Sequence, residues 1–177
     1  LCKSKKLTRL ILLRNRISGP IPSGIANCPK LVRVRMGDNM LSGSIPPGIL
    51  SLPELDLLEL PRNRLNGDFP EINLTTPSSS SKLGSLDLSH NELTGTLPSS
   101  IGSLSGLVDL DLSGNRITGS MPEEIGSLKR LAKLDLSGNL MNGSLPLTIT
   151  HCSSLASIDL SHNRFRGEIP PELSNLN

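Results

Sequence analysis

Two arginines stand two residues apart in the segment Leu31-Val-Arg-Val-Arg-Met-Gly-Asp-Asn39. Residues two apart in a β-strand project from the same face, so Arg33 and Arg35 would lie side by side, about 7 Å apart at the backbone. Paired guanidinium groups suit a carboxylate, because each can bind it through two parallel hydrogen bonds. Gly37 follows the pair and is expected to leave room for a ligand to approach. These residues predict binding of an anionic group.

Hydrolytic chemistry is the second possibility, since Asp, Ser and His occur together at 87–90 and again at 159–162. The members of a catalytic triad converge from separate segments, whereas these residues follow one another along one strand and its turn. Two intervening copies of the pattern read Asp-Leu-Ser-Gly, without the histidine.

His151 and Cys152 form the remaining metal-like pair, and no second cluster accompanies them. No phosphate-binding glycine loop occurs either. We therefore predict a chain that is not an enzyme, with no metal site and no cofactor.

The composition limits the other classes of protein. The chain has 177 residues, enough for one domain, with 16 Gly, 14 Pro and only two aromatic residues, Phe69 and Phe165. A net charge of +2 argues against a nucleic-acid binder of the basic-patch kind. The longest aliphatic run, Leu10 to Leu13, is far too short to span a membrane. Aliphatic side chains must fill the core, because Trp and Tyr are absent.

An internal repeat predicts the fold. Asparagines recur at positions 15, 39, 63, 91, 115, 139 and 163, in steps of 24 residues with a single step of 28. Such a period indicates a solenoid. We align seven repeats of the frame LxxLxLxxNxLxGxIPxxIxxLxx over 7–177, with starts at 7, 31, 55, 83, 107, 131 and 155, and assign 1–6 to the end of a preceding repeat. The third repeat is four residues longer, which predicts a polar surface loop inserted at 73–82.

Each position of the repeat has a physical role. Positions 3 to 8 read xLxLxx, so the alternating centre is a short strand with Leu inward and positions 3, 5, 7 and 8 outward. The Asn at position 9 can satisfy backbone groups of the turn that would otherwise be buried unpaired. Stacked strands about 4.8 Å apart make a parallel sheet. We predict an α/β solenoid with this sheet on the concave face and short 3-10 helices or irregular turns on the convex face.

The three cysteines do not form an obvious disulfide framework. Cys28 and Cys152 occupy the same repeat position, where other repeats carry Leu. Five strand spacings, roughly 24 Å, separate them, so they are too far apart to bond with each other. We interpret both as buried free thiols that act as small apolar side chains. Cys2 lies in the preceding, incomplete coil, and a bond between Cys2 and Cys28 stays open.

Two N-glycosylation sequons, at Asn73 and Asn142, favour a secreted chain. Both lie away from the predicted strands, so glycans there would leave the concave face open.

Departures from the repeat's own average are the internal clue to function. The last four repeats approach the frame LDLSxN, whereas the first three are irregular and basic. Arg9 is expected beside Arg33 on the neighbouring strand, and without Trp or Tyr, arginine is the favoured contact residue left on this face. The alternative is that these are ordinary solvated charges, with Arg35 pairing sideways with Glu59 of the next repeat.

The GxIP motif with a 24-residue period resembles the plant-specific leucine-rich repeats of extracellular receptors, over residues 7–177. The run LVRVRMGDN, followed by LSGSIPPGILSLPELDLLELPRNRLNGDFPE, is similar to one stretch of class XI receptor kinase ectodomains, of the CLAVATA, BARELY ANY MERISTEM, TDIF-receptor and HAESA types. The resemblance implies a right-handed leucine-rich repeat superhelix on the extracellular (apoplastic) side of the plasma membrane. Because neither end carries a polar cap, we expect an internal fragment. A membrane span and a cytoplasmic Ser/Thr kinase would belong to the parent protein.

The resemblance also implies a site. In that family an Arg-x-Arg pair binds the free C-terminal carboxylate of a secreted peptide hormone, and the motif carries this role to Arg33 and Arg35. The implied partners are a CLE- or IDA-like peptide and a SERK-type co-receptor ectodomain. Glu59 and Asp38 are expected to orient the arginines. The residues expected to flank the peptide are Arg9, Ile11, Leu13, Leu57 and Glu59. The alternative function is an extracellular protein–protein interaction module of the polygalacturonase-inhibitor or receptor-like-protein kind.

Overall fold

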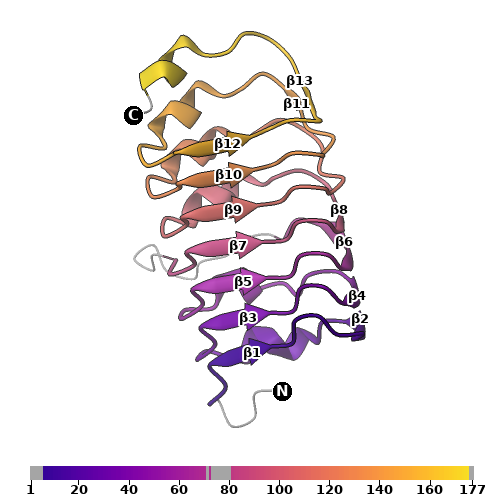
Figure 1. Ribbon diagram of the computed structural model, residues 1–177. Helices are drawn as coiled ribbons and strands as arrows, with labels where there is room; N and C mark the ends of the chain where they lie inside the picture. Colours follow the sequence, from indigo (N-terminus) through magenta and orange to yellow (C-terminus); the bar gives the residue numbers. More distant parts are fainter. Residues whose placement is uncertain (1–5, 71, 73–80, 176–177) are drawn as a thin grey trace.

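The computed structural model describes residues 6–70, 72 and 81–175, which form one continuous stack of coils (Figure 1). A seven-stranded parallel sheet runs along the stack, and its neighbouring strands come from successive repeats. In order, the strands are β1 (Arg9–Ile11), β3 (Arg33–Arg35), β5 (Leu57–Glu59), β7 (Ser85–Asp87), β9 (Asp109–Asp111), β10 (Lys133–Asp135) and β12 (Ser157–Asp159). The predicted parallel sheet is therefore confirmed.

Short 3-10 helices lie on the opposite side of the stack (Figure 1). They are η1 (Ser23–Asn27), η2 (Ile49–Ser51), η3 (Ser99–Ser103), η4 (Glu123–Ser127), η5 (Leu147–His151) and η6 (Pro171–Asn175). Five of them follow directly after the proline of the repeat motif, at Pro22, Pro98, Pro122, Pro146 and Pro170. Proline suits this position because its fixed φ matches the extended residue that precedes the helix and because it needs no donor there. The predicted α/β solenoid is confirmed on this face too.

A second set of parallel strands, which the sequence did not predict, follows the first turn of every coil except the one at 107–130, which has only an isolated bridge at Thr118. The strands β2 (Ser18–Pro20), β4 (Met40–Gly43), β6 (Arg64–Asp68) and β8 (Glu92–Thr94) pair in that order, and β11 (Asn142–Gly143) pairs with β13 (Arg164–Phe165). Their register is displaced by two residues from the repeat, since Ser18 pairs with Met40 whereas Arg9 pairs with Arg33.

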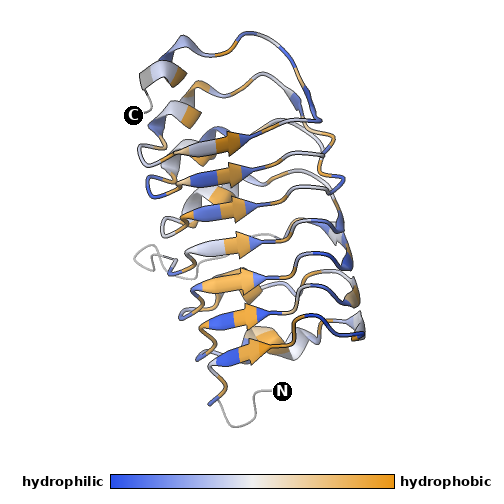
Figure 2. Cartoon of the chain, in the orientation of Figure 1, coloured by the Kyte–Doolittle hydropathy of each residue, from blue (hydrophilic) through white to orange (hydrophobic). Residues whose placement is uncertain are grey.

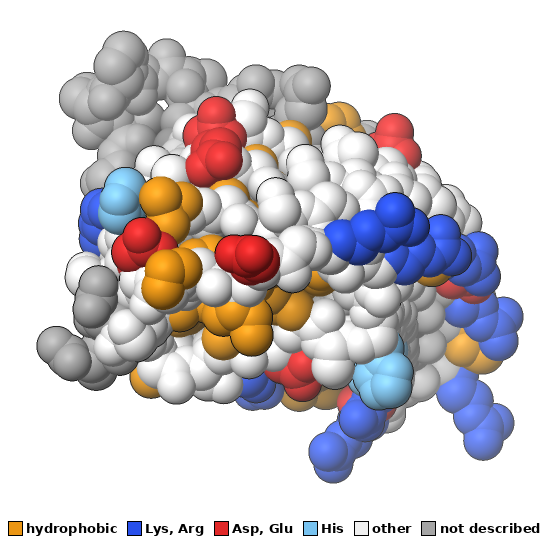
Figure 3. All heavy atoms as spheres, turned by 90° about the horizontal axis from the view of Figure 1, so that it is seen from above, with side chains coloured by type: hydrophobic (Ala, Val, Ile, Leu, Met, Phe, Trp, Pro, Cys, Tyr) orange, Lys and Arg blue, Asp and Glu red, His pale blue; other side chains and the backbone are white. Residues whose placement is uncertain are grey.

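The core is a set of columns of aliphatic side chains that run along the stack. Each strand of the first sheet turns its central residue inward, and Leu58, Leu86, Leu110 and Leu134 are 0–1% exposed. Figure 2 shows hydrophilic and hydrophobic residues sharing these strands. At the C-terminal end of the stack, apolar side chains reach the surface (Figure 3), and Ile169 is 77% exposed. Each inner coil therefore buries its apolar faces against the coils on either side.

The asparagines at position 9 form a ladder of buried amides. Asn115 donates from Nδ2 to the carbonyl oxygens of Leu88, Leu112 and Ser113 at 3.0–3.3 Å, and its Oδ1 accepts the N–H of Leu93 at 3.0 Å. One side chain thus binds the backbone of its own coil and of the coil before it. The predicted role of this amide, satisfying buried backbone groups of the turn, is confirmed.

The turn before each asparagine passes through a left-handed residue. Position 8 adopts a left-handed conformation in every repeat, with φ of 53–55° at the non-glycine residues Arg14, Asp38, Arg62, His90 and His162, and 64° at Gly114 and Gly138. Positions 7 and 8 were expected to project outward, and Ser89, His90 and Ser113 do line a hollow together with Asp87 and Asp111 of position 5. Ser89 and Ser113 are nevertheless only 5% and 8% exposed, and each hydroxyl donates to the aspartate two residues before it.

The cysteine prediction is half right. Cys152 is a buried free thiol, as expected, and its Sγ lies 3.2 Å from the carbonyl oxygen of Ile125. Burial raises the pKa of this thiol, and the nearby Lys129 opposes the change. Cys28, however, is disulfide-bonded, so its interpretation as a free thiol is wrong. The sequence left a bond between Cys2 and Cys28 open, and Cys2 lies outside the described residues.

Candidate functional site

The strand β3 carries both arginines on the concave face. Val34 between them is fully buried, which fixes the strand against the core and turns its two neighbours outward. The Arg33 side chain is 49% exposed and the Arg35 side chain 40%. Side chains at positions 33 and 35 are thus accessible to a ligand while their backbone is held by pairing on both sides.

Arg33 lies among a second arginine and an apolar residue. It pairs with Arg9 on β1 and with Leu57 on β5. Its nearest opposite charge is Asp56, whose Oδ2 lies 3.9 Å from the arginine Nε. Because Arg9 makes no ion pair within the described part of the chain, this corner of the sheet carries an excess of positive charge.

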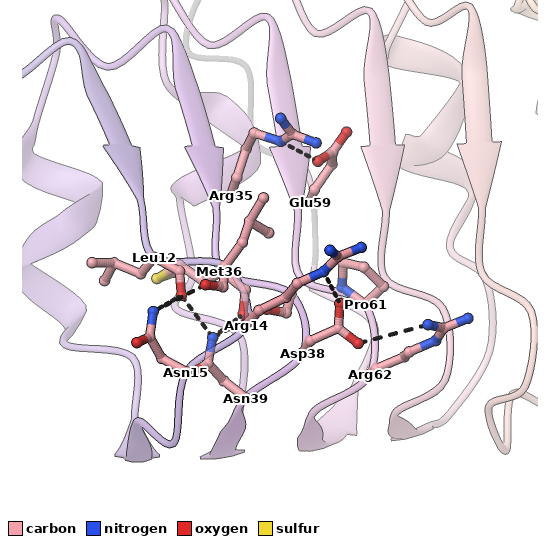
Figure 4. Close-up of polar contacts among 12 residues, drawn as sticks. Leu12, Arg14, Asn15, Arg35, Met36, Asp38, Asn39, Glu59, Pro61 and Arg62 are labelled. Carbon is pink, nitrogen blue, oxygen red and sulfur yellow. Dashed lines mark hydrogen bonds and ion pairs between the residues drawn. The ribbon is translucent and has the colours of Figure 1, made fainter.

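Arg35 pairs sideways with Glu59, the alternative that the sequence left open. Its Nε donates to Oε2 of Glu59 at 2.5 Å across neighbouring strands (Figure 4). Asp38 was also expected to orient these arginines, which is wrong. Its carboxylate contacts Arg14 and Arg62 at 3.9 and 3.7 Å, because position 38 lies in the left-handed turn beyond the strand (Figure 4).

Gly37 does not leave room for a ligand, so that expectation is also wrong. The residue is buried, and a Cβ placed on it would lie 2.9 Å from Cγ of Pro61. Pro61 occupies the same position in the next repeat, where the later repeats carry Ser. The glycine is therefore required by the proline of the adjacent coil.

The residues expected to flank a peptide surround the arginines with mixed chemistry. Ile11 pairs with Arg35 and is 53% exposed, which is high for an isoleucine on a sheet. Leu13 and Leu57 are half-buried, and Glu59 is engaged by Arg35. An anion at the arginines would thus have apolar surface on both sides of β3.

The rest of the concave face is acidic. In the sequence, the aspartates at position 5 belong to the common frame LDLSxN of the repeat and were assigned no function. Glu59, Asp87, Asp109 and Asp111 line a shallow hollow together with Lys133. Burial raises the pKa of Asp87; hydrogen bonds from Ser89 lower it, and the charges of Asp111 and Glu59 raise it again. The column of Asp at position 5 could have been found by aligning the repeats and summing charge along each position.

The Asp and Ser residues of the triad-like segments bond each other within one turn. Ser89 donates from its N–H and from Oγ to Oδ1 of Asp87, and Ser113 and Ser137 bond Asp111 and Asp135 in the same way. In residues 6–70, 72 and 81–175, no three His, Cys, Asp or Glu side chains gather as metal ligands would. The same residues contain no helix with the length and apolar character needed to cross a bilayer.

One of the two sequons lies among the described residues. Asn142 is exposed in β11, on the second set of strands and away from the first sheet. Asn73 and positions 73–80 of the expected 73–82 insertion lie outside the described residues. Glycosylation at both positions stays a prediction.

Comparison with known proteins identifies the repeat. One leucine-rich-repeat family model matches residues 71–117 and 81–141, and a second matches 6–28 and 154–176. A search of curated proteins finds no match.

Solved structures match along almost the whole chain. The Arabidopsis receptor kinase HAESA, solved with the peptide hormone IDA and the co-receptor SERK1, is 38% identical with a TM-score of 0.92, covering 99% of this chain and 29% of that one. The plant peptide hormone receptor RGFR1, in complex with RGF2, is 36% identical with a TM-score of 0.90, covering 97% and 27%. This chain therefore spans less than a third of either.

A pollen receptor kinase 3 structure is 31% identical with a TM-score of 0.77, and the match covers 91% of this chain and 76% of that one. With the repeat models, the coils and these matches in agreement, the chain belongs to the leucine-rich repeat family, in the form found in plant receptor kinase ectodomains.

Proposed function

We propose that this chain is the part of a plant receptor kinase ectodomain that binds the free C-terminal carboxylate of a secreted peptide hormone, through Arg33 and Arg35. The observation that carries the proposal is the placement of two accessible guanidinium groups on one strand, with a third, Arg9, beside them. Each charge-assisted contact of this kind contributes about 1.5–3 kcal/mol.

The charge pattern favours a single terminal carboxylate over an anionic polymer. The arginines of this sheet lie on β1 and β3, and Lys133 on β10 is the one other cation of its strands, whereas Glu59, Asp87, Asp111, Asp135 and Asp159 continue along the same face. A ligand with many negative charges would lie over these carboxylates and be repelled by them. A peptide that ends at β3 would place one negative charge on the basic strands.

Structural relatives support the same ligand class and suggest the second partner. HAESA was solved with a peptide hormone and a co-receptor, and RGFR1 with RGF2. We propose a CLE- or IDA-like peptide and a SERK-type co-receptor for this chain, on the extracellular side of the plasma membrane. The class XI type, a membrane span and a cytoplasmic kinase in the parent protein belong to the same proposal.

Isothermal titration calorimetry tests the proposal with a panel of CLE- and IDA-like peptides, each as free acid and as C-terminal amide. We expect the free acid to bind more tightly, and Arg33→Ala or Arg35→Ala to weaken its binding by about 10- to 150-fold. Lys133→Ala is the control, because Lys133 holds the position of Arg33 on the distant strand β10. Equal affinity for acid and amide would refute the proposal and favour a protein–protein interaction module.

A further inference from the structure

The two arginines of β3 are held in different ways. Arg35 donates from Nε to Glu59 Oε2, and the Glu59 side chain is only 21% exposed (Figure 4). Arg33 has a longer 3.9 Å contact with Asp56, and both of those side chains are about half exposed. The guanidinium of Arg35 is therefore fixed by a partly buried partner, whereas that of Arg33 remains free to turn.

A guanidinium group offers two edges to a carboxylate. One consists of Nε with an Nη atom, and the other of the two Nη atoms. Glu59 occupies Nε of Arg35, so the Nη pair is the edge that remains for a ligand. Arg33 forms no hydrogen bond at either edge within the described residues, so both of its edges remain available.

We infer that Glu59 is a positioning residue, which holds Arg35 so that its two Nη atoms bind the ligand carboxylate end-on. The inference rests on the proposed function and adds an unequal division of roles within it. Arg35 is ordered before the ligand arrives, and Arg33 is ordered by the ligand. Ordering a long side chain in advance removes a cost of binding that corresponds to about 2- to 12-fold in affinity.

Two variants of Glu59 separate positioning from charge. Glu59→Gln and Glu59→Ala both remove the negative charge, but only the glutamine keeps an oxygen that can accept the bond from Arg35 Nε. If Glu59 acted through its charge alone, the two variants would bind a free-acid peptide equally well. Positioning predicts that Glu59→Gln binds about 2- to 12-fold more tightly than Glu59→Ala.

The experiment combines calorimetry with NMR on the full chain. The ligand is the tightest-binding free-acid peptide of the CLE- and IDA-like panel, with its amide as the comparison. Asp111→Asn and Asp111→Ala are the matched controls, because Asp111 holds the position of Glu59 on β9 but bonds Ser113. In ¹H–¹⁵N spectra of the free protein, we expect one exchange-protected arginine Nε–H signal that Glu59→Gln retains and Glu59→Ala loses.

The possible failures are distinguishable. Equal affinities of the glutamine and alanine variants, or an Arg35 Nε–H that exchanges as fast as that of Arg33, would overturn the inference and leave the proposed function standing. If the unsubstituted chain bound the acid and the amide equally, both the inference and the proposed function would be overturned.

Discussion

The asparagine ladder offers the sharpest test of how the coils hold together, and Asn115→Ala is the perturbation. The amide of Asn115 bonds Leu88, Leu112 and Ser113 through Nδ2 and Leu93 through Oδ1. Each of the three carbonyls keeps a second donor, because neighbouring asparagines or a backbone N–H also bond them. Among the described residues, the acceptor for the N–H of Leu93 is the Asn115 oxygen.

The magnitude follows from this difference. An orphaned buried N–H costs about 1–3 kcal/mol, and each lost bond to a carbonyl that keeps another donor costs about 0.5 kcal/mol. Asn115→Ala should therefore lower the free energy of unfolding by about 2.5–4.5 kcal/mol. Asn115→Asp keeps the acceptor for Leu93 but turns a carboxylate oxygen toward three carbonyls, so we expect it to be at least as destabilising at neutral pH.

Asn15→Ala is the matched control. Asn15 holds the same position at the exposed end of the stack, where its Nδ2 bonds only Leu12 and Leu13 within the described residues (Figure 4). Its loss should cost less than about 1 kcal/mol. Urea unfolding followed by far-ultraviolet circular dichroism measures both, since no Trp or Tyr is present for fluorescence. Equal effects of the two substitutions would refute the reasoning that bonding between coils carries the cost.

Four further predictions follow from the same structure. Gly37→Ala should destabilise the chain by about 1–3 kcal/mol by crowding the proline ring, and Pro61→Ser in the same chain should restore part of the loss in a urea titration. Burial raises the pKa of Asp87, so its ionisation in the folded chain lowers stability as pH rises above about 3.9; Asp87→Asn should lessen that fall in melts from pH 3 to 7. Cys152 should react with iodoacetamide only on unfolding, because the thiol is buried and its pKa is raised; alkylation of the native chain, seen by mass spectrometry, would contradict this. Chain secreted from plant cells should lose mass with an N-glycosidase, and Asn142→Gln should remove part of that loss.

The sequence was sufficient for the first sheet because its signal is periodic. Residues one repeat apart become lateral neighbours, so the contact between Arg9 and Arg33 and that between Arg35 and Glu59 follow from arithmetic once Leu58 and its equivalents are assigned to the core. The lateral pairings of the candidate site were predictable for the same reason.

The misses at Asp38, Gly37 and the second set of strands share one physical cause, which is the turn after each strand. Asp38 is itself left-handed, so its carboxylate reaches Arg14 and Arg62 instead of the arginines of β3, and the space beside Gly37 is filled by Pro61 of the next turn. The second sheet begins after this turn, and strands such as Met40–Gly43 have no alternating pattern to mark them. The pairing register of these strands is displaced by two residues from the repeat. This displacement depends on the path of the whole coil, which local sequence does not encode.

Because each coil contacts only the coils next to it, the stack has a particular response to force. Among the described elements, each strand and 3-10 helix contacts only its counterparts in adjacent repeats. A pulling force on the two ends would therefore detach coils one at a time from an end. After the first coil, which contains the disulfide-bonded Cys28, each 24-residue coil would lengthen the extended chain by about 80 Å and the 28-residue coil by about 95 Å. The third repeat would thus leave its own mark, a single longer step in an otherwise even force–extension record.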